Sequence, residues 1–382
     1  MKTTLDKWFC GPNIDHGARP GRILFLIGCL GGGGEERQLV YLLQEMDRSR
    51  YRPALVVWNY EESDVNVPIV RSMGIPLWGF PINASSHHKL YQVVRLARML
   101  SPEVVHSYSN YTNFAAYCAA RAAGSIGIGS VQNEIDPASF IKKRPIMGRL
   151  SASLPRLQMS NSHAAANRIM SNGGWFTPGR FAIVTNPIDL TKFRDDPVPM
   201  HPPHVILGIG SLKPVKRWDR LLKITRELKL RNLPVQVLIA GEGPLRGELE
   251  TMAADLGIAD MIQFLGFCND IPDLIAGARL VVHTSDAEGT PNVVMEALAA
   301  GRAVVATDAG DVGKLIDNGK TGFVVACEDT ETLAARVIDI VTDNGLAERM
   351  GKAAREHARR EFSMARPLNE MFDVYRSAGW KS

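Results

Sequence analysis

The stretch DAEGTPNVVMEAL, residues 286–298, decides the fold of this chain and carries two carboxylates eight positions apart, Glu288 and Glu296. Strand-like apolar runs precede it at 278–283 and follow it at 303–307. This pattern predicts a strand–helix–strand unit, from which parallel sheets covered by helices are built. The N-terminus of the helix is then expected at the carboxyl edge of the sheet, where such folds bind their ligands.

The start of this helix has the features of a phosphate site. Thr290 is a good N-cap residue, and Pro291 suits the first helical turn because its missing N–H costs nothing there. The backbone amides of Asn292 and Val293 are therefore expected to point outward. A helix end of this kind binds phosphate groups.

The two carboxylates suit a nucleotide sugar. An ionised carboxylate only accepts hydrogen bonds, and its two oxygens match the two neighbouring hydroxyls of a ribose. Glu296 is not explained as a capping-box residue, because the third position after Thr290 is Val293 and not Glu or Gln. We therefore expect Glu296 to bind a ribose and Glu288 to face a sugar. The alternative is that both are ordinary solvated helix-end acids, and the flanking strands favour the ligand site.

Short apolar runs alternate with amphipathic helical stretches along the whole chain, as in parallel sheets covered by helices. Two series of strands are predicted, the first at 22–28, 53–58, 104–107, 157–160 and 181–185, and the second at 205–210, 235–240, 262–265, 280–283 and 303–306. Between them lies the proline-rich segment DDPVPMHPP, residues 195–203, which has the character of a linker. We place the domain boundary there.

Composition agrees with a globular protein of two or three domains, since 45% of the 382 residues are hydrophobic. No apolar run approaches the roughly 18 residues that cross a bilayer, and residues 1–20 lack a signal-peptide core. The cysteines are odd in number and scattered, which argues against a disulfide framework and a zinc site; they are Cys10, Cys29, Cys118, Cys268 and Cys327. A cytoplasmic location is expected.

Several motifs in a fixed order resemble those of retaining glycosyltransferase family 4, a group of GT-B fold enzymes. They are GGEER at 33–37, NPID at 186–189, AGEGP at 240–244, FLG at 264–266, EGTPNVVMEA at 288–297 and AVVATDAG at 303–310. Each motif is weak alone, and their order and spacing together are specific.

This resemblance implies an α/β architecture of two doubly wound, Rossmann-like domains that face each other across a cleft. The expected organisation is an extension (1–21), an acceptor-binding domain (22–194), a linker (195–204), a nucleotide-sugar-binding domain (205–366) and a C-terminal helix (367–382) that crosses back to the first domain.

The loop GSLKPVKR, residues 210–217, carries three cations, as a diphosphate leaving group requires. In the family pattern an Arg directly follows the glycine and a Lys comes five residues later, both on the donor phosphates. Lys216 matches the second position, whereas Ser211 replaces the Arg. Either Lys213 or Arg217 could supply the missing charge, and the alternative is that both are ordinary solvated residues.

A glycine run at 31–34 follows the first strand. It is not a dinucleotide-binding fingerprint, because Leu30 stands where the second glycine should be if Gly28 is the first, and no Walker lysine follows. A close approach to a ligand and a plain surface turn both remain open. The resemblance favours a role for Gly33 and Gly34 in closing over the donor diphosphate.

The resemblance thus implies a full set of donor contacts, with Glu288 and Lys216 as the catalytic pair. The donor-binding set is Gly33, Gly34, Ser211, Lys216, Arg217, Gly243, Gly266, Gly289, Thr290, Pro291, Asn292, Val293 and Glu296. The implied mechanism is front-face transfer with retention, in which the leaving diphosphate accepts the acceptor proton and cations stabilise it. It needs no metal and no cofactor, and the nucleotide is expected to be UDP.

The acceptor site is less defined. Family members place a His near the cleft edge of the first domain, where this chain has SVQNE at 130–134. Asn133 and Glu134 are therefore candidate acceptor contacts. His106, at the end of a predicted strand, is another, although a structural histidine explains it equally well.

Basic residues are concentrated in the first half of the chain, where residues 1–200 carry 22 Lys+Arg against 15 Asp+Glu. Residues 137–188 contain no acidic residue and seven basic ones. Apolar and basic residues interleave at 140–147, which suggests a peripheral contact with an anionic membrane. A solvated basic surface is the alternative. Nucleic acid is not expected, because no aromatic stacking series or binding module accompanies the charge.

The sequence therefore predicts a hexosyltransferase that uses a nucleotide sugar and a lipid-linked or polysaccharide acceptor in the synthesis of surface polysaccharide, lipopolysaccharide or exopolysaccharide. A nucleotide-sugar epimerase or phosphorylase of the same fold is one alternative. The other is a non-catalytic partner subunit, which the loss of the family Arg at Ser211 would fit.

Overall fold

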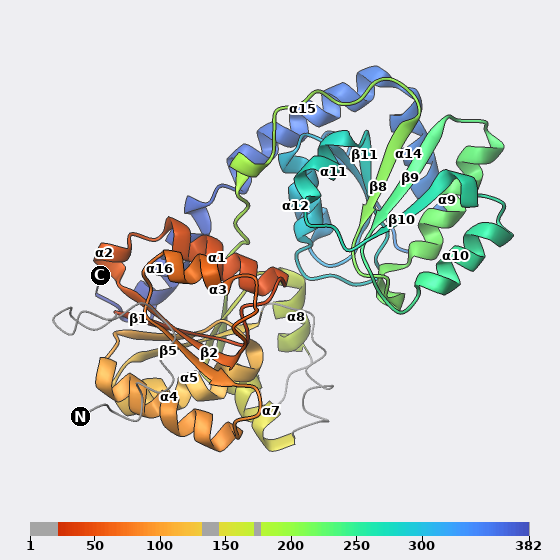
Figure 1. Cartoon of the computed structure of the whole chain (residues 1–382). Helices are drawn as coiled ribbons and strands as arrows, with labels where there is room; N and C mark the ends of the chain where they lie inside the picture. Colours follow the sequence, from red (N-terminus) through yellow and green to blue (C-terminus); the bar gives the residue numbers. More distant parts are fainter. Residues whose placement is uncertain (1–21, 132–144, 172–176, 382) are drawn as a thin grey trace. The chain divides into compact units, whose positions relative to one another are not determined.

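The structure is a computed structural model that describes residues 22–131, 145–171 and 177–381 (Figure 1). It divides into two compact units, the first formed by Met1–Pro187 together with Met364–Ser382 and the second by Ile188–Ser363. Both are α/β units with one parallel sheet each, as the sequence predicted.

The first unit contains a seven-stranded parallel sheet with the order β3-β2-β1-β4-β5-β6-β7. Its strands are β1 (Ile23–Ile27), β2 (Pro53–Tyr60), β3 (Leu77–Pro81), β4 (Val104–Ser107), β5 (Ile126–Val131), β6 (Leu157–Ser160) and β7 (Arg180–Ile183). Every residue of β1 and β4 is buried, because helices cover both faces of the sheet.

Consecutive residues of β1 point to opposite faces and enter different cores. Phe25 packs with α1 (Gly34–Glu45), α3 (Val67–Ser72) and the C-terminal helix α16 (Ala365–Ser377). Leu26 packs on the other face with α4 (Ser86–Leu100) and α5 (Asn113–Ala123). The remaining helices are α2 (Arg48–Tyr51), α7 (Pro145–Ser153), which lies beside α5, and α8 (His163–Ser171), which contacts β6.

The second unit contains a six-stranded parallel sheet with the order β10-β9-β8-β11-β12-β13. Its strands are β8 (His204–Ile209), β9 (Val235–Ala240), β10 (Ile262–Gly266), β11 (Leu280–His283), β12 (Ala303–Thr307) and β13 (Gly322–Val325). Neighbouring strands pair in parallel throughout.

Two layers of helices cover this second sheet. One layer is α9 (Trp218–Leu230), α10 (Arg246–Asp255) and α14 (Thr330–Thr342). The other is α11 (Ile271–Gly277), α12 (Asn292–Ala299), α13 (Val312–Leu315) and α15 (Asn344–Glu361). Leu280 and Val282 of β11 enter one core and Val281 enters the other, which explains why the first three residues of this strand are all apolar.

The segment predicted as a linker is part of the second unit, which begins at Ile188 and not after residue 204. Three arginines from the body of this unit hold the segment by donating to its backbone carbonyls. Arg355 Nη2 donates to Arg194 O and Asp196 O, Arg302 to Asp196 O and Pro197 O, and Arg279 Nη1 to Pro199 O. Proline content indicated a linker between the two domains, but the three guanidinium groups hold the segment on the second unit.

No helix in the described part of the chain is long and apolar enough to cross a membrane.

Candidate functional site

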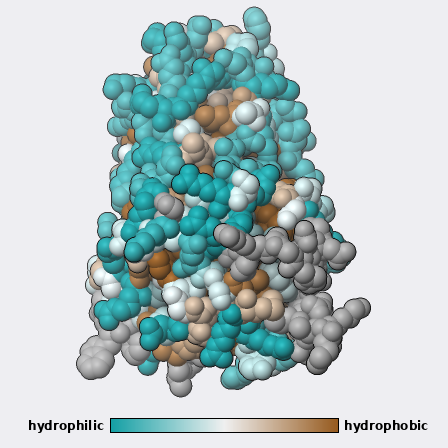
Figure 2. Space-filling view, turned by 90° about the vertical axis from the view of Figure 1, so that its left-hand side faces the viewer, coloured by the Kyte–Doolittle hydropathy of each residue, from teal (hydrophilic) through white to brown (hydrophobic). Residues whose placement is uncertain are grey.

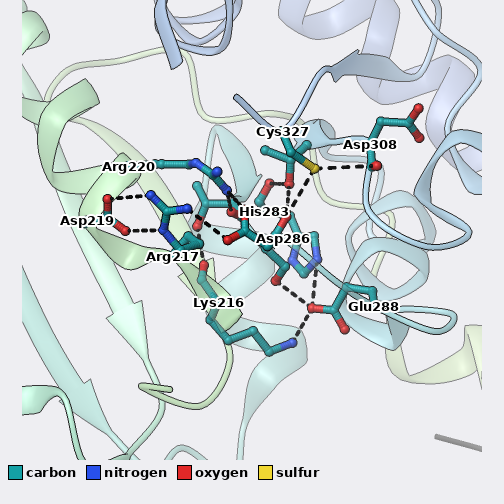
Figure 3. A network of polar contacts seen from close by, with 12 residues as sticks. Lys216, Arg217, Asp219, Arg220, His283, Asp286, Glu288, Asp308 and Cys327 are labelled. Atoms are coloured by element: carbon teal, nitrogen blue, oxygen red, sulfur yellow. Dashed lines mark hydrogen bonds and ion pairs between the residues drawn. The ribbon is translucent and has the colours of Figure 1, made fainter. Parts of the chain in front are cut away.

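The second sheet has a switch point between β8 and β11, because the chain leaves β8 towards one face and β11 towards the other. Ligands of open parallel sheets bind in the crevice at such a point, beyond the carboxyl ends of the strands. The loop after β8 holds Lys216 and the loop after β11 holds Glu288, so the two predicted catalytic residues meet there (Figure 3).

Backbone contacts join these two loops. Thr284 Oγ1 donates to Lys216 O at 2.7 Å, and the Asp286 amide donates to Val215 O at 2.9 Å. Arg220, from the first turns of α9, donates to Thr284 O at 2.8 Å and pairs with Asp286 at 2.6 Å. The relative position of Lys216 and Glu288 is therefore fixed by the fold and not by their own side chains alone.

Glu288 accepts hydrogen bonds on one oxygen, Oε1. Lys216 Nζ pairs with it, Ser285 Oγ donates to it at 2.6 Å, and His283 Nε2 lies 3.2 Å away (Figure 3). Burial alone would raise the pKa of Glu288, but the contact with His283 and the positive charge of Lys216 outweigh it and lower the pKa to about 2. Glu288 is therefore an ionised, partly desolvated carboxylate at neutral pH.

The helix after Glu288 begins one residue later than predicted. α12 starts at Asn292 with Pro291 in the N-cap position and no side-chain cap, so Thr290 is not the N-cap. Thr290 Oγ1 instead donates to Asp311 at 3.1 Å, and the Asp311 amide donates to Gly289 O at 3.0 Å. The neighbouring loop thus holds the turn that precedes α12 without capping the helix, and the N-terminus of α12 still lies at the sheet edge.

A glycine in that neighbouring loop keeps the Glu288 turn in place. Gly310 has a φ of +66°, and a Cβ there would lie 2.0 Å from Glu288 O. The motif at 240–244 has the same property, since a Cβ on Gly243 would lie 2.5 Å from Leu212 O in the cation-bearing loop. Gly266, at the end of β10, has a φ of +73°. Gly310 and Gly243 thus allow their loops to pack closely on the backbone of the site.

The cationic side chains of the loop after β8 differ in whether they already pair with an acidic residue of the protein. Arg217 pairs with Asp219 and Asp286, both at 2.9 Å, so its charge is already used within the protein. Lys213 is exposed and has no ion pair among the described residues. Ser211 uses its carbonyl to accept the Trp218 indole N–H at 3.0 Å. That Lys213 or Arg217 replaces the missing family Arg stays a prediction.

Glu296 lies within α12, partly buried, and its carbonyl accepts the Ala300 amide at the helix end. Its assignment to a ribose stays a prediction, as do the donor contacts of Asn292 and Val293.

In the first unit the glycine run forms the turn between β1 and α1. Gly33 is the N-cap of α1 with extended backbone and Gly34 is its first residue. The next residue, Glu35, accepts a hydrogen bond from Ser109 Oγ, which itself accepts from the Gly28 amide at 3.0 Å. Burial raises the pKa of Glu35 to about 7 despite the hydrogen bond from Ser109.

We expect Glu35→Gln to change how stability depends on pH. The folded pKa, about 7, lies above the ordinary value of 4.5, so the folded protein binds the extra proton and loses stability as pH rises through this window. Glutamine does not titrate, and it keeps a carbonyl for Ser109. Relative to wild type, the variant should gain about 3 kcal/mol in free energy of unfolding at pH 8 and almost nothing at pH 4.5. Urea unfolding at both pH values measures this. The exposed Glu45→Gln on the same helix is the control, and an equal change at both pH values for Glu35→Gln would contradict the prediction.

His106 has the contacts of a structural histidine, and its assignment as an acceptor contact stays a prediction. Its side chain is only 1% exposed, its Nδ1 lies 2.7 Å from the hydroxyl of Tyr375 in α16, and its Nε2 lies 3.0 Å from Ser130 Oγ. Burial lowers the pKa of His106 to about 3, so it stays neutral. It anchors the C-terminal helix to the first sheet. Asn133 and Glu134, the other acceptor candidates, lie outside the described residues.

Sequence reasoning missed three residues of the site, namely Arg220, His283 and Ser285. Arg220 is one of several helix cations in the sequence, and His283 ends a strand whose other residues are apolar. Only Ser285, three residues before Glu288 in a predicted loop, offered a local signal.

Comparisons with known proteins agree with this geometry. A family model described as Glycosyltransferase Family 4 matches residues 32–192, and one described as Glycosyl transferases group 1 matches residues 191–357. The putative glycosyltransferase EpsD of Bacillus subtilis is 30% identical over 190 residues, or 50% of each chain. An alpha-D-kanosaminyltransferase of Streptomyces kanamyceticus is 31% identical over 46% of each chain. The chain thus spans about half the length of these curated relatives.

Among solved structures, Anabaena Alr3699/HepE in complex with UDP superposes with a TM-score of 0.77 at 21% identity, covering 93% of this chain and 100% of that one. The chain has two doubly wound units, and α12 begins beside the switch point of the second. This is the GT-B class of glycosyltransferase folds. The chain belongs to glycosyltransferase family 4 within this class.

Proposed function

We propose that this protein is a retaining glycosyltransferase that moves a hexose or N-acetylhexosamine from a UDP-sugar to a lipid-linked or polysaccharide acceptor in cell-surface glycan synthesis. The observation that carries the proposal is the Lys216–Glu288 pair at the switch point of the second sheet, beside the N-terminus of α12. Family membership supports it, as do the HepE structures, which were solved with UDP and with UDP-glucose.

In this proposal Lys216 and the first turn of α12 bind the donor diphosphate, while Glu288 binds hydroxyls of the donor sugar and Glu296 the ribose. The bond from the anomeric carbon to the diphosphate breaks, and the acceptor hydroxyl attacks from the same face. Its proton passes to the departing diphosphate oxygen, so no protein base is required. Lys216 stabilises the negative charge that develops on the leaving group. The proposal assigns this task to protein groups and to no metal or cofactor.

Donor binding requires Lys216 to exchange Glu288 for a phosphate. The two side chains are 20% and 13% exposed, so the ion pair lies at the edge of the crevice where a ligand can reach it. The backbone contacts of Thr284 and Asp286 with the Lys216 loop do not involve the lysine ammonium, and they can persist during this exchange.

A thermal-shift and donor-hydrolysis screen tests the proposal. The purified protein is mixed with UDP-glucose, UDP-galactose, their N-acetyl forms and other nucleotide sugars, alongside Glu296→Ala and Lys216→Ala. We expect one donor to stabilise the protein and to be slowly hydrolysed, with both effects lost in the variants. Absence of binding by every donor would overturn the site assignment.

Binding without turnover would instead favour a non-catalytic partner subunit. The specific observation behind this second candidate is Ser211, which stands where the family has an Arg. If Lys213 supplies the charge of the family Arg that Ser211 replaces, Lys213→Ala should weaken binding of the diphosphate relative to wild type. Lys213→Arg should not.

We further propose a peripheral contact with an anionic membrane, at the cytoplasmic face, through residues 137–188. Of this range, 145–171 and 177–188 are described, with Arg149, Arg156 and Arg180 exposed. The adjoining helices α4 and α5 also contain no acidic residue. The space-filling view shows one side of the molecule, where apolar and polar side chains are interspersed (Figure 2).

Liposome sedimentation tests this contact. We expect binding to vesicles with anionic lipid at low salt, and release at high salt, because each basic residue contributes about 1 kcal/mol near such a surface. Failure to sediment at low salt would remove the idea.

A further inference from the structure

His283, the last residue of β11, is a buried side chain directed at the candidate sugar-binding carboxylate. It is 2% exposed, and its Nε2 lies 3.2 Å from Glu288 Oε1 (Figure 3). This contact is close but imperfectly aligned, and Nε2 has no better hydrogen-bond partner among the described residues. A buried polar nitrogen without a well-formed partner is uncommon and calls for an explanation.

The three groups that reach Glu288 all contact the same oxygen. Lys216, Ser285 and His283 converge on Oε1, and the structure records no contact to Oε2 within its described residues. Oε1 is thus the anchored oxygen, and Oε2 is the one left to accept from a ligand.

If a diphosphate binds to Lys216, the negative charge of Glu288 loses the cation that now pairs with it. A partly buried carboxylate that loses its cation is strongly destabilised unless other donors hold it. The neighbouring arginines cannot take over, because Arg217 and Arg220 pair with Asp286. Ser285 and His283 remain. Hydrogen bonds in unliganded sites are often loose and tighten in the complex, which matches the geometry of the His283 contact.

We propose that His283 is a positioning residue for Glu288. Once the donor diphosphate engages Lys216, His283 and Ser285 hold Oε1 and thereby present Oε2 to the hydroxyls of the donor sugar. The inference rests on the proposed function. It assigns His283 to recognition of the sugar and not of the nucleotide.

The test compares the affinity for UDP with the affinity for the UDP-sugar found in the donor screen, by titration calorimetry. His283→Met removes the donor, whereas His283→Gln places an amide N–H near the position of Nε2. For the methionine variant we expect UDP affinity within about twofold of wild type, and UDP-sugar affinity and turnover each about tenfold lower. The glutamine variant should recover most of both losses.

His283→Asn supplies a second comparison if the methionine variant fails to fold, because its shorter amide cannot reach Oε1. An equal loss of UDP and UDP-sugar binding, or no loss of either, would overturn the positioning role. Failure of the proposed function looks different, since the wild-type protein would then neither bind nor hydrolyse any nucleotide sugar.

Discussion

Replacing Lys216 with Ala should lower the turnover of the preferred nucleotide sugar by about 10² to 10³-fold. Lys216 is the cation that the fold places beside Glu288, and the backbone contacts of its loop with Thr284 and Asp286 do not depend on its side chain. The variant should therefore keep its fold and lose the charge that stabilises the leaving diphosphate. Initial rates with the donor identified by binding measure this effect.

Lys352→Ala is the matched control, because it removes an equal charge from an exposed position on α15 to which no role in the site is assigned. We expect it to lower turnover much less than Lys216→Ala. Loss of Lys216 also removes a group that keeps the pKa of Glu288 low, so that pKa should rise in the variant. If Lys216→Ala stays within tenfold of wild type while folded, leaving-group stabilisation lies elsewhere in the site.

The core of the site could be predicted because it is local in sequence. Glu288 and α12 lie between two strands within one short motif, and the loop of Lys216 directly follows β8. The exact start of α12 could not be predicted, because the partner of Thr290 is Asp311, from a loop after the next strand. His283 was missed for a similar reason, since only the folded structure shows that the end of β11 is directed at Glu288.

Three strands were missed because their sequences are weak strand signals. β3 contains a glycine and ends in a proline, β5 contains two glycines, and β13 begins with a glycine. These strands are placed in the sheets by pairing with neighbouring strands. β13, for example, pairs with the strongly apolar β12. Long-range contacts also explain His106, whose partner Tyr375 is 269 positions away.

The proline-rich segment shows most clearly what composition conceals. Its carbonyls are held by arginines that stand just before β11, just before β12 and within α15, none of which is near it in sequence. Composition reports that prolines and aspartates avoid regular structure. Composition does not show which arginines elsewhere in the chain donate hydrogen bonds to the carbonyls of this segment.

Arg302→Met should therefore destabilise the second unit by about 3 kcal/mol. The Arg302 side chain is fully buried and donates to Asp196 O at 3.1 Å, Pro197 O at 3.2 Å and Ala276 O at 2.6 Å. Burial lowers its pKa to about 10, which shows that enclosing this cation is itself costly. Methionine removes that cost but leaves Pro197 O and Ala276 O without this donor, whereas Asp196 O keeps Arg355, and each buried carbonyl left without a donor costs about 1 to 3 kcal/mol. Urea unfolding measures the loss, with the exposed Arg226→Met as control.

Hydrogen exchange separates two ways in which the unit can respond. If the 195–203 segment stays in place, it lacks the hydrogen bonds that Arg302 donated. Exchange of its backbone amides is then little changed, and the full loss of stability appears. If the segment instead detaches into water, its amides should exchange faster than those of β12, and the loss in global unfolding free energy should be smaller. Unchanged stability together with unchanged exchange would contradict the prediction. The free energy that the Arg302 guanidinium gains from its hydrogen bonds would then only equal the cost of its burial, and Arg302 would not hold the segment.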